Sequence, residues 1–440
     1  MKNILDVAKS IRPALRVRLQ DGGTQPRMKF QIQPQGGEDV AGPVRPFPTV
    51  DPQKINTMSL ATAFDDAIAH HRSLGRADRI ANSQAAKSAM NQFNVNSLLG
   101  KNEKLLKSEN GYGGNAPITI GNRGVETTGL SLAPAFEMGG FNTCPNHASC
   151  KDSCLGKTAG NFFKIGGGMD LSAFEGPRLN SLNKTLFMMN NTGAFATRLY
   201  DEIAAARHEA EKNGNHLGLR LNVLSDIHPR VHQSIIKSFP YVSFYDYTKM
   251  KYDSIATNHH YTYSSTGLSQ PDVHNPHTNW RQMRRRLDNG DNVAMAFTDK
   301  EHLPETVYDQ ETGKTYRVIN GDMHDFRPLD TLYEPAGTDG VIVGLKNKKS
   351  FGKVGEAHKD SKGFFVKYDP GRIKTENGTF EREESKELGP SGKQKLGPTK
   401  ITNRQVVISA QQTKITPVLS DIALSSEPIN SIFRHAQNNY

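Results

Sequence analysis

The chain has 440 residues, a formal net charge of +10 at pH 7 and only three cysteines. This length suits two or three domains, or one large domain with extensions. The odd number of cysteines excludes a disulfide scaffold. The absence of any run of about 18 apolar residues excludes a membrane-spanning helix. Because Asp6, Lys9 and Arg12 interrupt the first residues, no signal peptide is expected, and we predict a cytoplasmic protein with no membrane partner.

The charge is unevenly distributed along the chain. Residues 1–120 carry a net charge of +6, residues 121–344 carry −3, and residues 345–440 carry +7. Basic flanks often contact nucleic acid, so a nucleotide or nucleic-acid partner is one expectation. A solvated surface that keeps the protein soluble is the alternative interpretation.

Composition divides the chain into four regions. Residues 1–50 read as an irregular extension rich in glycine and proline, and residues 51–120 as a helical amino-terminal region. Residues 121–346 alternate strand-like and helix-like patterns and form the predicted core. Residues 347–440 read as a basic, irregular and partly disordered extension, although the apolar residues Val406, Val407 and Ile408 could pack back on the core.

The core contains seven strand candidates. They are Gly129–Phe136, Leu217–Leu224, Tyr241–Tyr247, His259–Ser264, Asn292–Thr298, Tyr316–Asn320 and Val341–Leu345. Helical spacing of apolar residues lies between them, in 179–213, 231–239 and 278–287. Strands that alternate with helices predict an α/β fold with a parallel sheet. A partial or complete β/α barrel accounts best for the pattern, and a doubly wound sheet is the competitor.

All three cysteines lie within eleven residues, at Cys144, Cys150 and Cys154, just after the first strand candidate. Thiolates this close together repel one another unless a metal neutralises them, so we predict a metal site. Three thiolates from one loop suit a [4Fe–4S] cluster with one open iron. Zinc, with His147 as a fourth ligand, is the alternative.

The strand-then-cysteine-loop plan is similar to that of radical S-adenosylmethionine enzymes, in which a β/α barrel carries three cysteines after its first strand. That resemblance implies S-adenosylmethionine as a possible second cofactor. Ser225 and Asp226 occupy the end of the second strand candidate, where that family contacts its cofactor. Gly166 and Gly167 follow the cysteine loop and would let the backbone bend round a cluster or ligand.

A closer resemblance is to the phage and plasmid "gene product 88" family. The segments that carry it are 143–145 with Cys150 and Cys154, then 221–226, 244–249 and 340–345. The resemblance covers about residues 120–345. It implies a mobile-element origin and carries no activity.

Polar residues follow several strand candidates. The carboxyl ends of parallel strands carry the site in such folds, so we predict that Asp226, Lys249, Asp322, His324 and Asp325 line the substrate side. His and carboxylate groups perform general acid–base chemistry or bind a metal. For the last three residues, a loop stabilised by local hydrogen bonds is the competing interpretation.

These features together predict a metal-dependent enzyme, of iron–sulfur type, that acts on a nucleotide or nucleic acid, and the radical-enzyme resemblance implies radical chemistry. The alternative is a zinc-stabilised protein that binds nucleic acid without catalysis. The sequence leaves the reaction, the substrate and the oligomeric state open.

Overall fold

The computed structural model describes residues 45–51, 54–110, 117–134, 141–146, 176–250, 255–266, 280–299, 301–333, 339–347, 364–368, 372–374, 380–382 and 404–408. Helices within these residues are α2 (Thr57–Ser73), α3 (Arg76–Asn91), α4 (Glu103–Asn110), α6 (Pro177–Asn190), α7 (Thr192–Lys212), α8 (Pro229–Ser238), α9 (Trp280–Asp288) and the 3-10 helix η4 (Arg327–Tyr333). Strands are β1 (Leu99–Gly100), β2 (Thr119–Ile120), β3 (Arg123–Leu130), β4 (His216–Arg220), β5 (Ser243–Thr248), β6 (His259–Ser264), β7 (Val293–Phe297), β8 (Thr306–Asp309), β9 (Thr315–Asn320), β10 (Ile342–Lys346), β11 (Arg372–Lys374), β12 (Phe380–Arg382) and β13 (Gln405–Ile408).

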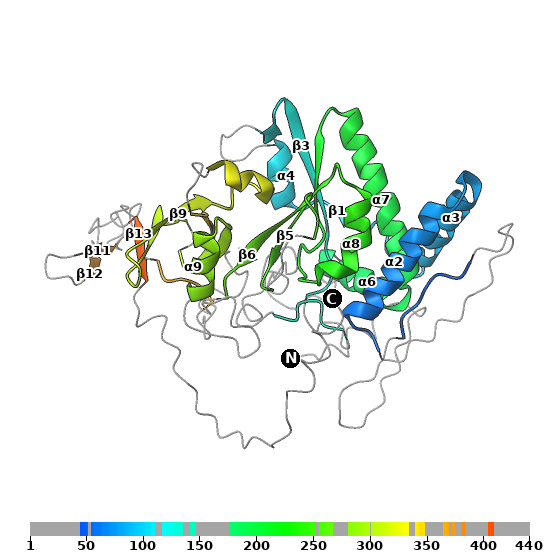
Figure 1. Cartoon of the computed structure of the whole chain (residues 1–440), viewed down its shortest axis with the longest axis horizontal. Coiled ribbons are helices and arrows are strands. Elements are labelled where there is room, and N and C mark those ends of the chain that lie inside the picture. The colour runs from blue at the N-terminus through cyan, green and yellow to red at the C-terminus, as the bar shows by residue number, and fades with distance from the viewer. Residues whose placement is uncertain are drawn as a thin grey trace, which may run out of the picture.

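One mixed sheet organises the described part of the chain (Figure 1). Its strand order is β1-β3-β4-β5-β6-β7-β10-β9-β8-β13, and β2 pairs with β3. Six of these strands, β3, β4, β5, β6, β7 and β10, are mutually parallel and follow one another in chain order. Among the described residues this sheet does not close between β1 and β13, so it does not form the complete barrel.

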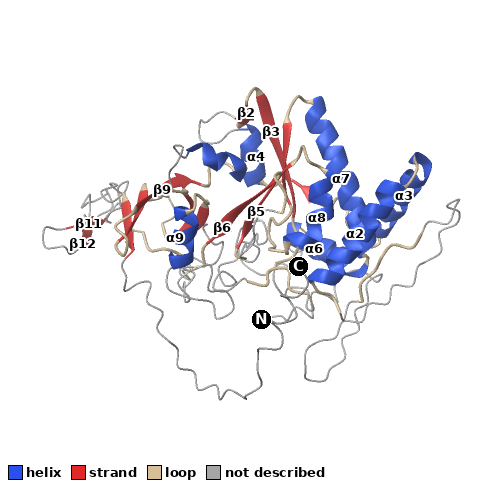
Figure 2. Ribbon diagram, in the orientation of Figure 1, coloured by secondary structure: helices blue, strands red, loops and turns tan. Residues whose placement is uncertain are grey.

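The order of the parallel strands also decides against the doubly wound alternative. In a doubly wound sheet the strand order reverses at a switch point, and helices then cover both faces. Here the order from β3 to β10 has no reversal. Since crossovers between parallel strands are right-handed, consecutive strands in one direction place their crossover helices on one face. The crossover helices α6, α7 and α8 lie together beside β3, β4 and β5, and α2 and α3 of the amino-terminal region pack against them (Figure 2).

Most strand predictions are confirmed within one or two residues at each strand start, and β6 matches at both ends. The first is wrong: β3 ends at Leu130, next to where the predicted strand begins. Small and polar residues such as Thr127 and Gly129 break up its apolar pattern. The predicted sixth strand is β9, which belongs to an insertion between β7 and β10 and pairs antiparallel with β8.

Capping residues mark the ends of several helices. At the start of α2, the Asn56 side chain accepts from the Ser59 backbone N–H and the Ser59 hydroxyl accepts from the Asn56 N–H, which completes a capping box. His228 caps α8 ahead of Pro229. Gly214 adopts a φ of +71° after α7, a conformation that glycine tolerates and that ends the helix.

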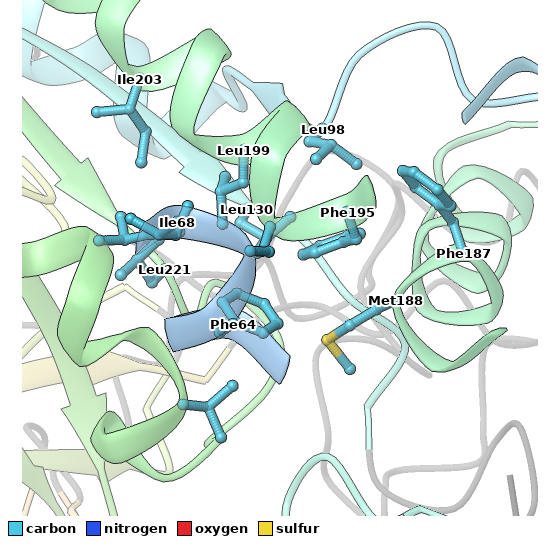
Figure 3. Packing of buried hydrophobic residues seen from close by; sticks show 14 of the residues in the cluster. Phe64, Ile68, Leu98, Leu130, Phe187, Met188, Phe195, Leu199, Ile203 and Leu221 are labelled. Carbon is cyan, nitrogen blue, oxygen red and sulfur yellow. The ribbon is translucent and has the colours of Figure 1, made fainter. Parts of the chain in front are cut away.

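The main hydrophobic core lies between the helices and the face of the sheet that carries Leu217, Leu219 and Phe244. Phe64 and Ile68 of α2, Phe187 of α6 and Phe195 of α7 pack there with Leu130 (Figure 3). A second cluster surrounds Trp280, and Val406 and Ile408 of β13 are buried in it. The carboxyl-terminal region is therefore not wholly irregular, because 405–408 extends the sheet and 372–374 pairs with 380–382.

The opposite face of the sheet carries Arg220, Tyr245, Tyr247, His260 and Thr262, and we call it the polar face. The segment that leads into η4 covers it. Phe326 packs edge-on against Tyr245, with ring centroids 5.3 Å apart. A Cβ atom at Gly218 would lie 2.6 Å from the Phe326 ring, so the absence of a side chain makes room for this contact.

Replacing Gly218 with alanine should destabilise the protein by about 1–3 kcal/mol, because the added methyl group overpacks the Phe326 ring. In a Phe326→Leu background the same substitution should cost less. Urea unfolding of the wild type, the two single variants and the double variant measures both costs. Gly100→Ala is the matched control, since a Cβ there meets nothing within 4 Å. Equal penalties with Phe326 and with Leu at 326 would contradict the packing argument.

Candidate functional site

Four loops meet at the carboxyl ends of β3, β4, β5 and β6. They bring together Cys144, Asp226, Lys249 and Ser264, three of which the sequence predicted from separate strand ends. The Asp226 backbone N–H donates to the carbonyl oxygen of Thr143 at 2.8 Å, which joins the first loop to the second. The parallel register explains this meeting, since it places all carboxyl ends at one edge.

Cys144 is half-buried at this edge, and its neighbours hold it in place. Its backbone N–H donates to the Asn142 side-chain oxygen at 2.9 Å, and its Sγ lies 3.4 Å from the Leu224 carbonyl oxygen. The Thr143 hydroxyl donates to the Ala133 carbonyl oxygen at 2.5 Å. The thiol is thus fixed beside the loop that carries Asp226.

Asp226 is the most constrained carboxylate of the site. Its Oδ1 accepts from the Thr248 hydroxyl and its Oδ2 from the Lys249 backbone N–H, both at 2.9 Å. Burial raises the pKa of Asp226 to about 6, although Lys249 and the two hydrogen bonds act in the opposite direction. A carboxyl group with this pKa changes protonation state close to neutral pH.

Asn222 shapes the loop, a role that the sequence prediction did not assign. Its side-chain oxygen accepts from the Ser225 hydroxyl at 2.9 Å and from the Ile227 N–H at 3.0 Å. Its backbone N–H donates to Asp246 at 2.6 Å. Ser225, predicted to bind a cofactor, is buried and hydrogen-bonded within this loop. Nothing in the sequence pointed to this role, because the predicted strand 217–224 includes Asn222, whereas β4 ends at Arg220 and leaves Asn222 free to form an Asx turn.

Two of the remaining predicted residues, His324 and Asp325, belong to a second, buried group. Asp325 accepts from Arg220 at 3.2 Å, and the Tyr245 hydroxyl lies 3.5 Å from it. Arg327 pairs with Asp330 at 3.1 Å, and both side chains are fully buried. His324 Nδ1 lies 3.0 Å from the Arg327 guanidinium. Asp325 and His324 therefore belong to an ionic network on the polar face.

Asp322 lies apart from this network. Its Oδ2 accepts from the backbone N–H of Lys346, the last residue of β10, at 3.1 Å. The Lys107 ammonium group of the α4 segment donates to the Asp322 carbonyl oxygen at 3.2 Å. Asp322 thus connects α4 to the carboxyl end of the sixth parallel strand.

Arg220 connects the two groups. Its Nη1 contacts Asp325, and its Nη2 donates to the Val223 carbonyl oxygen at 3.3 Å, within the loop that leads to Asp226. The guanidinium lies 4.7 Å from the centre of the Tyr247 ring. Burial alone would lower the pKa of Arg220. The negative charge of Asp325 and the neighbouring groups has the larger effect and raises this pKa, so the guanidinium stays protonated.

Several predicted residues fall outside the described part of the chain: Cys150, Cys154, Gly166, Gly167 and His147. Among the described residues, no three His, Cys, Asp or Glu side chains form a metal-binding group. That statement does not cover the cysteine loop beyond residue 146. Nor does any helix within the described ranges have the length and apolar character needed to cross a bilayer.

Comparison with known proteins identifies the family of the chain. The family model for gene product 88 matches residues 96–367, which is more than half of the chain and includes all six parallel strands. The chain belongs to the gene product 88 family. No match was found among curated proteins or among solved structures. The closer of the two resemblances is thus confirmed, and the radical-enzyme resemblance stays an expectation.

The free energy of unfolding should depend on pH through Asp226. Its pKa is about 6 in the folded chain against 3.8 in the unfolded chain, so the folded state binds the extra proton between these values. The stability of the wild type relative to Asp226→Asn should therefore fall by about 2 kcal/mol as pH rises from about 4 to about 6, out of about 3 kcal/mol over the whole titration. Urea unfolding of chelator-treated proteins measures this, and a pH-independent difference would contradict it.

Replacing Asp325 with alanine should destabilise the protein by about 3–5 kcal/mol, because it leaves the Arg220 guanidinium buried without its carboxylate. Asp291→Ala is the matched control: it breaks the 3.1 Å pair with Arg286 at a side chain that is 39% exposed, and should cost less than about 1 kcal/mol. Thermal unfolding compares the two. Similar small losses in both would show that the network does not stabilise the fold.

Proposed function

We propose that this gene product 88 protein is a metal-dependent enzyme of iron–sulfur type whose site lies at the carboxyl edge of its parallel strands. The observation that carries the proposal is the position of Cys144 beside Asp226 and Lys249. Cys144 follows the first of six parallel strands in chain order, and the other two cysteines follow it within ten residues. In the proposed site, a thiolate ligand would therefore lie close to Lys249, which can bind an anionic substrate, and to Asp226, which can transfer protons.

The strand order supports one further structural proposal. Six parallel strands in unbroken order form the wall of an open, partial β/α barrel, and the polar face is its inner side. In barrels of this kind the side chains at the carboxyl ends of several different strands make the active site. Asp226, Lys249 and Ser264 come from three such strands.

The donor set of the cysteine loop fits a cluster. Cys144 is half-buried, is held by backbone contacts and makes no disulfide among the described residues. In the proposed site, Cys144, Cys150 and Cys154 would hold the iron atoms. When bound, such a cluster supplies one-electron chemistry, and an open iron would accept S-adenosylmethionine.

The described residues would perform the remaining tasks. The Lys249 ammonium group lies 3.4 Å from the Ser264 hydroxyl and presents a positive charge to an anionic group of the substrate, such as the phosphate of a nucleotide. Asp226 would accept or release a proton near neutral pH. Arg220 and its network would keep the inner side of the site rigid and exclude water from beneath it.

Metal analysis of protein purified without oxygen tests the proposal. The wild type should contain about four iron and four sulfide per chain with broad visible absorption. Cys144→Ala should lose both iron and colour, since each of three thiolates holds one iron. Pro145→Ala is the control, because it changes the same loop and leaves every thiol in place, and it should retain its iron.

Two outcomes would overturn the assignment. A Cys144→Ala protein that keeps its iron would show that this thiol is not a ligand. A colourless wild type with about one zinc would show a structural site, and would favour a zinc-stabilised protein that binds nucleic acid without catalysis. If iron is found, incubation of the reduced protein with S-adenosylmethionine should release cleavage products in the wild type only.

A further inference from the structure

A basic groove lies along α3, away from the residues of the proposed site. It has a volume of about 590 Å³, and Arg76, Arg79 and Lys87 of α3 line it together with Arg198 of α7. No aspartate or glutamate is among its lining residues. Ile80 lies between the cations and is half exposed. The groove therefore combines a concentrated positive charge with a small apolar surface.

The charges of the groove are available to a ligand. Arg76 and Lys87 are exposed, and neither forms an ion pair with any residue that the structure describes. Arg79 donates to the carbonyl oxygens of Arg72 and Leu74, at 3.2 and 2.9 Å, which fixes its guanidinium without neutralising it. Arg198 is the exception, because it pairs with Glu202 at 3.0 Å.

The arginine-rich helix α9 shows what a neutralised basic helix looks like in the same protein. Arg284 pairs with Asp309 and Glu311 at 2.8 and 3.0 Å, and Arg286 pairs with Asp291 at 3.1 Å. These pairs neutralise two arginines of α9. Arg76 and Lys87 of α3 have no such partner among the described residues, so the groove keeps charge that a ligand can meet.

We propose that the α3 groove docks the phosphate backbone of a nucleic acid. Arg76, Arg79 and Lys87 lie at helical positions i, i+3 and i+11 and share one face with Ile80 and Ser83. The row is about 16 Å long, which is about half of one helical turn of B-form DNA measured along its axis. The phosphates of a duplex recur at a fixed spacing on a stiff backbone, whereas the carboxylates of an acidic peptide have no such fixed spacing.

The groove does not depend on the proposed iron–sulfur site. Three of its cations precede residue 96, where the match to the family begins, and none of its residues contacts Cys144, Asp226 or Lys249. The two proposals are therefore separable. The iron content should be the same in groove variants and in the wild type, whichever way the binding experiment turns out.

Fluorescence anisotropy with a labelled DNA duplex, measured on the full chain over a range of salt concentrations, tests the proposal. The double variant Arg76→Gln/Lys87→Gln should bind about tenfold more weakly at about 0.1 M salt. The slope of log affinity against log salt should fall by about 1.8, because two phosphate contacts with the duplex are lost. Both side chains are exposed and make no described ion pair, so thermal unfolding should be unchanged.

The matched control is Arg281→Gln/Arg285→Gln, which removes two charges from the exposed side of α9 and should leave the slope unchanged. Equal slopes in the two double variants would overturn the proposal, since the binding would then reflect net charge alone. A wild type that does not bind the duplex would also overturn it. Polyglutamate that competes as well as unlabelled duplex at equal charge would identify an acidic protein as the partner instead.

Discussion

The buried ionic network on the polar face is the interaction on which the arrangement of the site depends. A guanidinium that leaves water must gain a carboxylate, and Arg220 and Arg327 do so through Asp325 and Asp330. Asp325 and Asp330 belong to the segment that follows β9, whereas Arg220 ends β4. The pairing therefore ties an insertion in the second half of the sheet to its first half. The loop with Asp226 begins directly after Arg220, so the position of Arg220 also fixes where this loop starts.

The sequence predicted most strands of the parallel sheet well because the position of a strand in the chain depends on local information. A short apolar run bounded by turn residues identifies β5, β6, β7 and β10, and parallel pairing follows from the helices between them. Most of strand β3 was not predicted, because Thr127 and Gly129 interrupt its apolar pattern. Both residues lie on the polar face, where Gly129 makes room for Val223 and the Thr127 hydroxyl donates to the Leu105 carbonyl oxygen. Its pattern reflects contacts that only the tertiary structure supplies.

The candidate site was predictable to the same extent and for the same reason. Cys144, Asp226 and Lys249 follow strands, and a parallel register brings such residues to one edge whatever their separation in sequence. The partners of Asp325 were not predictable in this way, because Arg220 lies 105 residues away and reads as an ordinary strand residue. A run of Asp, His and Arg cannot show by itself whether its charges face substrate or one another.

The partners of the charged groups distinguish two roles. Arg220 and Arg327 face carboxylates on the polar face, and such pairs hold structure because their charges are already matched. Breaking a buried ion pair is costly, because either charge would be left uncompensated. Asp226 instead accepts from the Thr248 hydroxyl and the Lys249 backbone N–H, and burial raises its pKa although the charge of Lys249 acts in the opposite direction. The Arg220–Asp325 pair therefore favours rigidity, whereas the proposed proton transfer suits Asp226.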